Sequence, residues 1–195
     1  MQNFDSSVLN LIEQGNQSAV ALVNLLAEHF PSFKDECRFE GRKVRFLKRA
    51  QIFVADLWAA FEGDSYGTFH DIEKITMFAG LFMCIWFVLQ LSYTSTDYRV
   101  PQMLHALDCL VYSPPLEAHI RKNQALDDRI TWEIELRGCS IWCVEQLRRE
   151  IVRKHPDAEN VNAILIDFFL YDAVKELEAS GDEPIPHHRK RTIFY

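Results

Sequence analysis

The sequence has few cysteines, and their spacing matches neither a disulfide framework nor a metal site. The five cysteines, at positions 37, 84, 109, 139 and 143, include no CxxC pair. Cys139 and Cys143 are four residues apart in an expected helix and could share one face, but a structural zinc site requires four ligands. We therefore expect buried, reduced thiols and no bound metal.

Residues 1–16 are polar and mixed rather than apolar, so we also expect no secretory signal. Together with the reduced thiols, this composition favours a reducing, intracellular compartment. We expect the protein in the cytoplasm, with the nucleus as an additional location.

Positive charge is not in excess. The chain contains 21 Lys and Arg against 28 Asp and Glu, which gives a net charge of -7. This balance argues against a general polyanion binder, although a local basic cluster can still hold one phosphate. The sequence contains no P-loop, GxGxxG, GxSxG or HExxH motif. We expect no cofactor and no direct binding of nucleic acid.

Charge is completely absent from the segment Ile75–Tyr93. About 18 or more such residues can cross a bilayer as a helix, so a single-pass membrane protein is one interpretation. The flanks, with Lys74 before and Arg99 after, show no strong positive-inside asymmetry. The neighbouring segments ITMFA and DYRVPQMLHAL also form one continuous motif when they are joined. We therefore rank a membrane span last and expect no membrane partner.

Helical periodicity dominates the sequence that is present, and 195 residues fit a single domain over 1–195. The expected fold class is mainly α, with a short hairpin that turns at Glu40-Gly41. Pro31 and Gly181 are expected to end helices, and Asp71 is expected to cap the turn that follows it. Apolar helix faces are predicted for the sets Leu22, Leu25, Leu26, Phe30; Ile52 or Val54, Leu57, Trp58, Phe61; and Met103, Leu104, Leu107, Val111.

Two aspartates lie inside apolar runs. Asp167 is embedded in NAILIDFFLYDAVKE, and a buried carboxylate is costly unless it has a partner or a function. For Asp56, an exposed position, a buried structural position and a role in a site all remain open. Glu133 and Arg137, at helical spacing i, i+4, are most simply a surface ion pair.

Several segments, taken in order, resemble the queuosine salvage family, the queuosine 5'-phosphate N-glycosylase/hydrolases. They are FEGRKVRFLKRAQIFVADLWAAF, ITMFA joined to DYRVPQMLHAL, WEIELRGCSIWCVEQLR, NAILIDFFLYDAVKE and PHHRKRTIFY. The resemblance implies a helical glycosylase-like domain with a small peripheral β-hairpin. It also implies hydrolysis of the N-glycosidic bond of queuosine 5'-monophosphate, which releases queuine for tRNA queuosine salvage. The expected partner is therefore a small-molecule nucleotide.

The same resemblance implies site residues by their motif positions. Two carboxylates can divide the work of breaking a glycosidic bond, and the candidates are Asp97 and Asp167. One would stabilise the sugar cation or activate water, and the other would hold the base; the assignment between them stays open. The cationic candidates for the 5'-phosphate are Lys48, Arg99, Arg137 and His187. The candidates for stacking on the base, each more often a core residue when taken alone, are Phe78, Trp142 and Tyr171.

Two features depart from the family pattern. The chain begins partway through the pattern, and the segment Gly80–Thr96 has no counterpart in it. Removal of this segment restores ITMFADYRVPQ, so we expect a hydrophobic insertion at 80–96 that derives from a retained intron. Because its apolar side chains favour aggregation, deletion of residues 80–96 is expected to improve solubility. The alternatives are an inactive isoform and a non-catalytic helical interaction protein.

The C-terminal segment PHHRKRTIFY combines a basic cluster with an apolar end. Taken alone, HHRKR would most often be a solvated basic patch, with metal binding a poor second. The terminal Ile-Phe-Tyr gains little in water. We therefore expect this tail to be docked against the domain.

Overall fold

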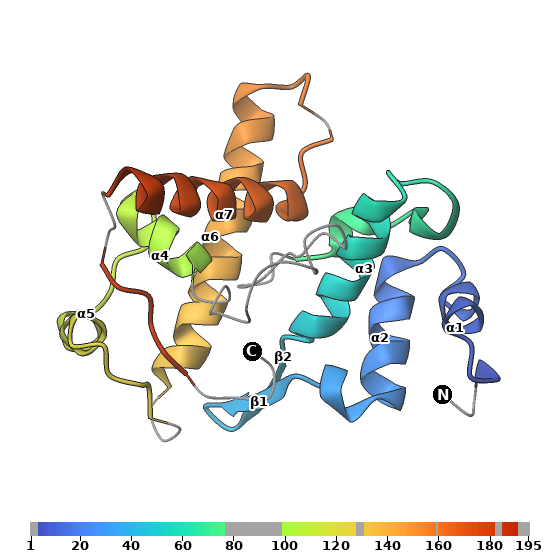
Figure 1. Cartoon of the computed structure of the whole chain (residues 1–195), viewed down its shortest axis with the longest axis horizontal. Coiled ribbons are helices and arrows are strands. Elements are labelled where there is room, and N and C mark those ends of the chain that lie inside the picture. The colour runs from blue at the N-terminus through green and yellow to red at the C-terminus, as the bar shows by residue number, and fades with distance from the viewer. Residues whose placement is uncertain (1–3, 77–98, 128–130, 159, 182–184, 191–195) are drawn as a thin grey trace. The chain divides into compact units, whose positions relative to one another are not determined.

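The computed structural model of the chain describes residues 4–76, 99–127, 131–158, 160–181 and 185–190. These residues divide into two compact units, one comprising 4–76 and the other running from Arg99 to Lys190. The described residues are mainly helical and include one two-stranded sheet (Figure 1). The predicted fold class is therefore confirmed. The single domain over 1–195 stays a prediction, and the predicted insertion at 80–96 lies outside the described residues.

The first unit is built on the helices α1 (Val8–Gln14), α2 (Ala19–His29) and α3 (Lys48–Ala60). Two of these helices begin at serine caps: Ser7 Oγ accepts the Asn10 N–H at 3.4 Å, and Ser18 Oγ accepts the Ala21 N–H at 3.1 Å. Helix α2 stops just before Pro31, as predicted. It packs against α3, and the residues buried on the two helices include Leu22, Leu26, Ala50 and Val54.

The buried side of α3 differs at its end from the predicted apolar face. Val54 is fully buried, as expected, but Phe61 is exposed. Helix α3 ends at Ala60, and the chain turns away at Glu62, where φ is 52°. Helical spacing does not continue beyond the last helical residue, so the prediction for Phe61 was wrong.

The predicted hairpin is present. Strands β1 (Glu36–Phe39) and β2 (Arg42–Arg45) pair in antiparallel register, with Cys37 opposite Val44. Glu40 and Gly41 form the turn and have φ values of 48° and 78°. A two-residue turn with two positive φ angles matches the twist of the strands, and glycine adopts such a conformation without steric cost. The turn therefore lies at Glu40-Gly41, as predicted.

Asp71 does not cap the turn that follows it, contrary to prediction. That turn, the 3-10 helix η4 (Ile72–Lys74), has no side-chain cap. The Asp71 carboxylate instead accepts hydrogen bonds at the start of α2, from Ser18 Oγ at 2.8 Å and from the Ala19 N–H at 2.6 Å. Burial alone would raise the pKa of Asp71, but these donors hold it below its usual value. An ionised carboxylate thus ties the end of the first unit to α2.

The second unit contains α4 (Arg99–Ala106), α5 (Pro114–Arg121), α6 (Trp132–Lys154) and α7 (Ala163–Ser180). Asn162 caps α7 by accepting the Leu165 N–H at 3.0 Å, and Gly181 ends it with φ of 82°, as predicted for this glycine. Helix α7 packs against both α4 and α6 (Figure 1). These three helices form the frame on which the candidate site is built.

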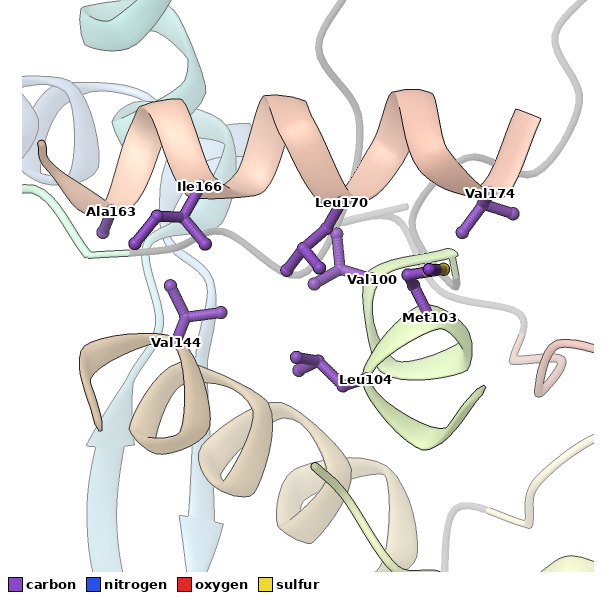
Figure 2. Packing of buried hydrophobic residues seen from close by; sticks show 8 residues of the cluster. All are labelled: Val100, Met103, Leu104, Val144, Ala163, Ile166, Leu170 and Val174. Atoms are coloured by element: carbon purple, nitrogen blue, oxygen red, sulfur yellow. The ribbon is translucent and has the colours of Figure 1, made fainter. Parts of the chain in front are cut away.

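Figure 2 shows the core between these helices. Val144 of α6 lies below Ala163 and Ile166 of α7. Farther along α7, Leu170 and Val174 lie near Val100 and Met103 of α4. The predicted stripe on α4 is correct for Met103 and Leu104, which are buried.

The same predicted stripe is wrong for Leu107 and Val111. Both are exposed, and Val111 is exposed by 83%. Helix α4 already ends at Ala106, and Asp108 has a positive φ of 56°. The chain therefore leaves the helical path directly after Leu107, so Val111 cannot join the buried face and Leu107 lies at the exposed end of the helix.

The tail is docked on the second unit, as predicted, for the residues that the structure describes. The Leu126 N–H donates to the Arg189 carbonyl at 2.7 Å, and Gln102 Nε2 donates to the Ile185 carbonyl at 2.8 Å. Ile185 is buried in a second apolar cluster, whose other buried members are Tyr112, Leu116, Ile120, Leu126 and Leu136. Residues 191–195 lie outside the described part of the chain.

In the described ranges, no helix has both the length and the apolar character needed to span a bilayer. Residues 77–93 of the predicted membrane candidate lie outside those ranges.

Candidate functional site

Asp167 lies at the edge of the buried face of α7. It follows Ala163 by four residues and precedes Leu170 by three, and both neighbours belong to the apolar cluster of Figure 2. The residue is only 2% exposed. A carboxylate shielded from water in this way interacts more strongly with a nearby positive charge than one in solvent. This candidate therefore has the burial that its predicted role requires.

A polar stripe continues the buried face of α6 toward its N-terminus. Glu133, Arg137, Ser140 and Val144 follow one another at intervals of four, three and four residues, so they share one side of the helix. Arg137 is 5% exposed, and its Nη1 lies 3.4 Å from Glu133 Oε1. The prediction of a surface pair was wrong, because the spacing alone does not reveal which helix face is covered. Arg137 is a buried cation with an acidic neighbour.

Arg99 is already engaged with an anion. It forms an ion pair with Glu178 of α7, and its Nη1 donates to Gln102 Oε1 at 3.2 Å. Gln102 in turn holds the Ile185 carbonyl of the tail. These contacts join α4, α7 and the tail through one polar network. Binding of a phosphate at Arg99 would exchange one anionic partner for another, which favours a ligand of higher charge.

The aromatic candidates differ in their positions. Tyr171 lies one turn after Asp167 on α7, so both side chains leave the same side of the helix. The Lys175 ammonium lies 4.3 Å from the centre of the Tyr171 ring. Trp142 is 61% exposed and lies five residues after Arg137, on another side of α6. The structure thus brings Tyr171, but not Trp142, onto the same side of its helix as a buried polar candidate.

Four buried polar residues of this unit were missed by the sequence analysis: Gln102, Ser140, Asn162, which caps α7, and His188. Gln102 interrupts the apolar run that follows Arg99, which is the kind of signal that singled out Asp167. His188 is next to the predicted His187, which is half-buried. Within the described ranges, Ser140 Oγ is buried with no hydrogen-bond partner. The buried polar groups of the second unit are therefore more numerous than predicted.

Lys48 belongs to the first unit. It is the first residue of α3 and is buried, and its N–H donates to Asp35 Oδ2 at 3.4 Å. Asp56 follows Lys48 by eight residues, so its side chain is rotated by about 80° around α3 from that of Lys48. Phe78 and Asp97 lie outside the described residues, so their predicted roles stay predictions.

Asp56 is a half-buried carboxyl group inside the first unit. Its Oδ1 atom is buried, and the described residues offer it no hydrogen-bond partner. Burial raises the pKa of Asp56 to about 7. Of the three possibilities left open by the sequence, a freely exposed position is thus excluded. A carboxyl group with a pKa near neutrality can hold or release a proton under cellular conditions.

Asp56→Asn is expected to stabilise the protein at pH 8 by about 2 kcal/mol, after allowance for its partial exposure, and to have little effect at pH 4. The folded-state pKa of about 7 exceeds the reference value of 3.8. As pH rises between these values, the unfolded chain loses a proton that the folded chain keeps, so the wild-type free energy of unfolding falls. Urea unfolding at both pH values measures this difference. The exposed Asp64→Asn serves as the control. If the difference in free energy of unfolding between wild type and Asp56→Asn were the same at both pH values, the prediction would be contradicted.

Among the described residues, no group of three His, Cys, Asp or Glu side chains is arranged to hold a metal ion. The candidate site is defined by the polar groups described above, a buried carboxylate on α7 and cations on α4 and α6.

Comparison of the sequence with known proteins identifies a matching family. Residues 1–195 match the family described as "Queuosine salvage protein". The "Queuosine 5'-phosphate N-glycosylase/hydrolase" of Schizosaccharomyces pombe is 41% identical over 203 residues, and those of Mus musculus and Sphaerobacter thermophilus are 39% and 36% identical over 199 and 194 residues. The alignments include 100% of this chain and 52%, 54% and 53% of these relatives. The chain thus spans about half the length of the curated relatives it matches.

The family match extends over the entire sequence, and the relatives from yeast, mouse and a bacterium all carry the same name. The resemblance found in the sequence motifs is therefore confirmed, and the chain belongs to the queuosine salvage protein family.

Proposed function

We propose that this chain hydrolyses the N-glycosidic bond of queuosine 5'-monophosphate and releases queuine. Family membership and the names of the relatives support the proposal. The observation that carries it in this chain is Asp167, a carboxylate that α7 holds almost fully buried beside the core. Because the chain spans about half of each relative, activity of this polypeptide by itself is part of the proposal.

The reaction requires a group that favours positive charge on the sugar. As the bond between ribose and base breaks, its electron pair leaves with the base, and the ribose ring becomes cationic. Water then adds to the anomeric carbon, and the base gains a proton. A preorganised carboxylate away from bulk water lowers the energy of the cationic state. We assign the two carboxylate roles to Asp167 and Asp97, one at the sugar or the attacking water and one at the edge of the base.

The remaining candidates would bind the two ends of the nucleotide. Arg99, Arg137 and His187 of the second unit are the cations proposed for the 5'-phosphate. The role of Lys48, which belongs to the first unit, stays a prediction from its motif. Tyr171 is proposed as a stacking surface for the base, because it shares one side of α7 with Asp167. The net charge of -7 supports a single nucleotide, rather than tRNA, as the ligand. We also propose that the protein works in the cytoplasm.

The proposed function is tested by incubation of the purified chain with queuosine 5'-monophosphate and detection of free queuine by mass spectrometry. Queuosine without its phosphate serves as the matched control substrate. We expect queuine from the nucleotide, and release at least about tenfold slower from the nucleoside, because the loss of one charge-assisted contact costs more than 1.4 kcal/mol. If the full-length Schizosaccharomyces pombe relative releases queuine and this chain does not, the chain is a non-catalytic member of the family.

A further inference from the structure

Two thiols from different elements of the second unit lie next to each other. Cys109 lies in the exposed segment just after α4, and its Sγ donates to the Leu107 carbonyl at 3.5 Å. Cys143 is half-buried on α6, and its Sγ donates to the Cys109 carbonyl at 3.5 Å. Burial raises the pKa of Cys143, and the neighbouring Cys109 and Cys139 thiols raise it further. The Cys143 side chain therefore contacts the backbone carbonyl of Cys109 and lies near the Cys109 thiol.

The packing around this pair holds the two segments together. Leu110, the residue after Cys109, and Cys143 both pack against the apolar cluster of Figure 2. The Leu110 N–H also donates to the Leu104 carbonyl of α4 at 3.0 Å. The approach of Cys109 to Cys143 is thus fixed by the core.

We infer that Cys109 and Cys143 form a dithiol site that mild oxidants such as hydrogen peroxide convert to a disulfide. The accessible Cys109 sulfur attacks one peroxide oxygen, the O–O bond breaks, and Cys109 becomes a sulfenic acid as one water is released. The Cys143 sulfur then attacks the Cys109 sulfur, the S–O bond breaks, and a second water leaves. In total the two thiols lose two electrons and two protons, and the peroxide is reduced to two waters.

Cys139 could compete with Cys109 for a disulfide bond to Cys143, but helix geometry disfavours a bond between Cys139 and Cys143. It lies one turn before Cys143 on α6 and is exposed. Side chains at i and i+4 of a helix leave in nearly parallel directions, whereas a disulfide needs its two Cβ atoms to point toward each other. Cys109 approaches Cys143 from a separate segment and has no such restriction.

The bond would join the end of α4 to α6. Helix α4 also carries Arg99 and Gln102, so oxidation would restrain the element that contributes this network to the candidate site. A disulfide that closes the loop between residues 109 and 143 restricts the unfolded chain. We expect the melting temperature of the oxidised protein to exceed that of the reduced protein by about 5 °C or more.

The full chain is treated with one equivalent of hydrogen peroxide, its remaining thiols are alkylated, and tryptic peptides are analysed by mass spectrometry. Cys109 lies in peptide 100–121, and Cys139 and Cys143 share peptide 138–148. We expect these two peptides to be cross-linked in the wild type and in Cys139→Ser, and the cross-link to be lost in Cys143→Ser and Cys109→Ser. A non-reducing gel must show the mass of a single chain.

Two results would overturn the inference. One is a cross-link that persists in Cys143→Ser, because Cys139 would then be the partner of Cys109. The other is a Cys139→Ser protein in which Cys109 is oxidised without any cross-link to peptide 138–148. Neither readout depends on hydrolase activity.

Discussion

Asp167→Asn is expected to slow queuine release at least about 100-fold under the proposed function. Asparagine keeps the size and the hydrogen-bonding atoms of the side chain but removes its negative charge. The charge acts on the cationic transition state more strongly than on the neutral ground state, and loss of one such preorganised group typically costs a factor of 10² to 10³ in turnover. The effect should therefore appear in kcat, with KM changed much less.

The matched control for this variant is Asp172→Asn, an exposed aspartate on the same helix. It removes the same charge from α7 and should leave turnover unchanged. Thermal unfolding of both variants tests the fold, and we expect Asp167→Asn to melt within a few degrees of the wild type. If Asp167→Asn kept near-parental turnover, or lost activity only in proportion to unfolding, Asp167 would lose its catalytic assignment. Asp97→Asn, the second candidate, is expected to give the same loss.

The helices could be predicted from the sequence because their signals are local. Pro31 after α2 and Gly181 after α7 are each read from a single residue. The errors at Phe61 and Leu107 came from helix ends: each is followed directly by a residue with a positive φ, which stops the helix and its buried face. Such a residue need not be glycine: Glu62 and Asp108 do it here. Composition therefore gave no warning at either position.

The candidate site could be predicted only where a charged residue stands out from an apolar run. Asp167 does so, and the structure confirms its burial. Arg137 does not, because the i, i+4 spacing of Glu133 and Arg137 is the same whether that helix face is exposed to solvent or buried. Gln102 and His188 depend on how the tail crosses the second unit, which is decided by contacts between residues far apart in the sequence. Local patterns carry no information about such contacts.

Asp71→Ala is expected to destabilise the first unit by about 3 kcal/mol. The variant removes two hydrogen bonds to an ionised acceptor, from Ser18 Oγ and from the Ala19 N–H, and the latter donor is buried at the start of α2. Hydrogen bonds to charged groups contribute about 1.5–3 kcal/mol each, and a buried donor left unpaired adds a cost of its own. The Ser18 cap on Ala21 remains, which keeps the loss below the sum of these terms. Urea unfolding at pH 7 measures the difference.

The exposed Asp64→Ala is the matched control for Asp71→Ala, because the Asp64 carboxylate accepts a local hydrogen bond from the adjacent Ser65 N–H, at 2.7 Å. Its cost should stay within about 1 kcal/mol. The pKa of Asp71 is lowered in the folded state, so its contribution is complete above the reference value of 3.8 and is lost as pH falls through the folded value. The difference in free energy of unfolding between wild type and Asp71→Ala should therefore become smaller in strong acid. Two results would show that this carboxylate does not hold α2 in place. One is a difference in free energy of unfolding that stays constant down to pH 2, and the other is a difference at pH 7 no larger than that caused by Asp64→Ala.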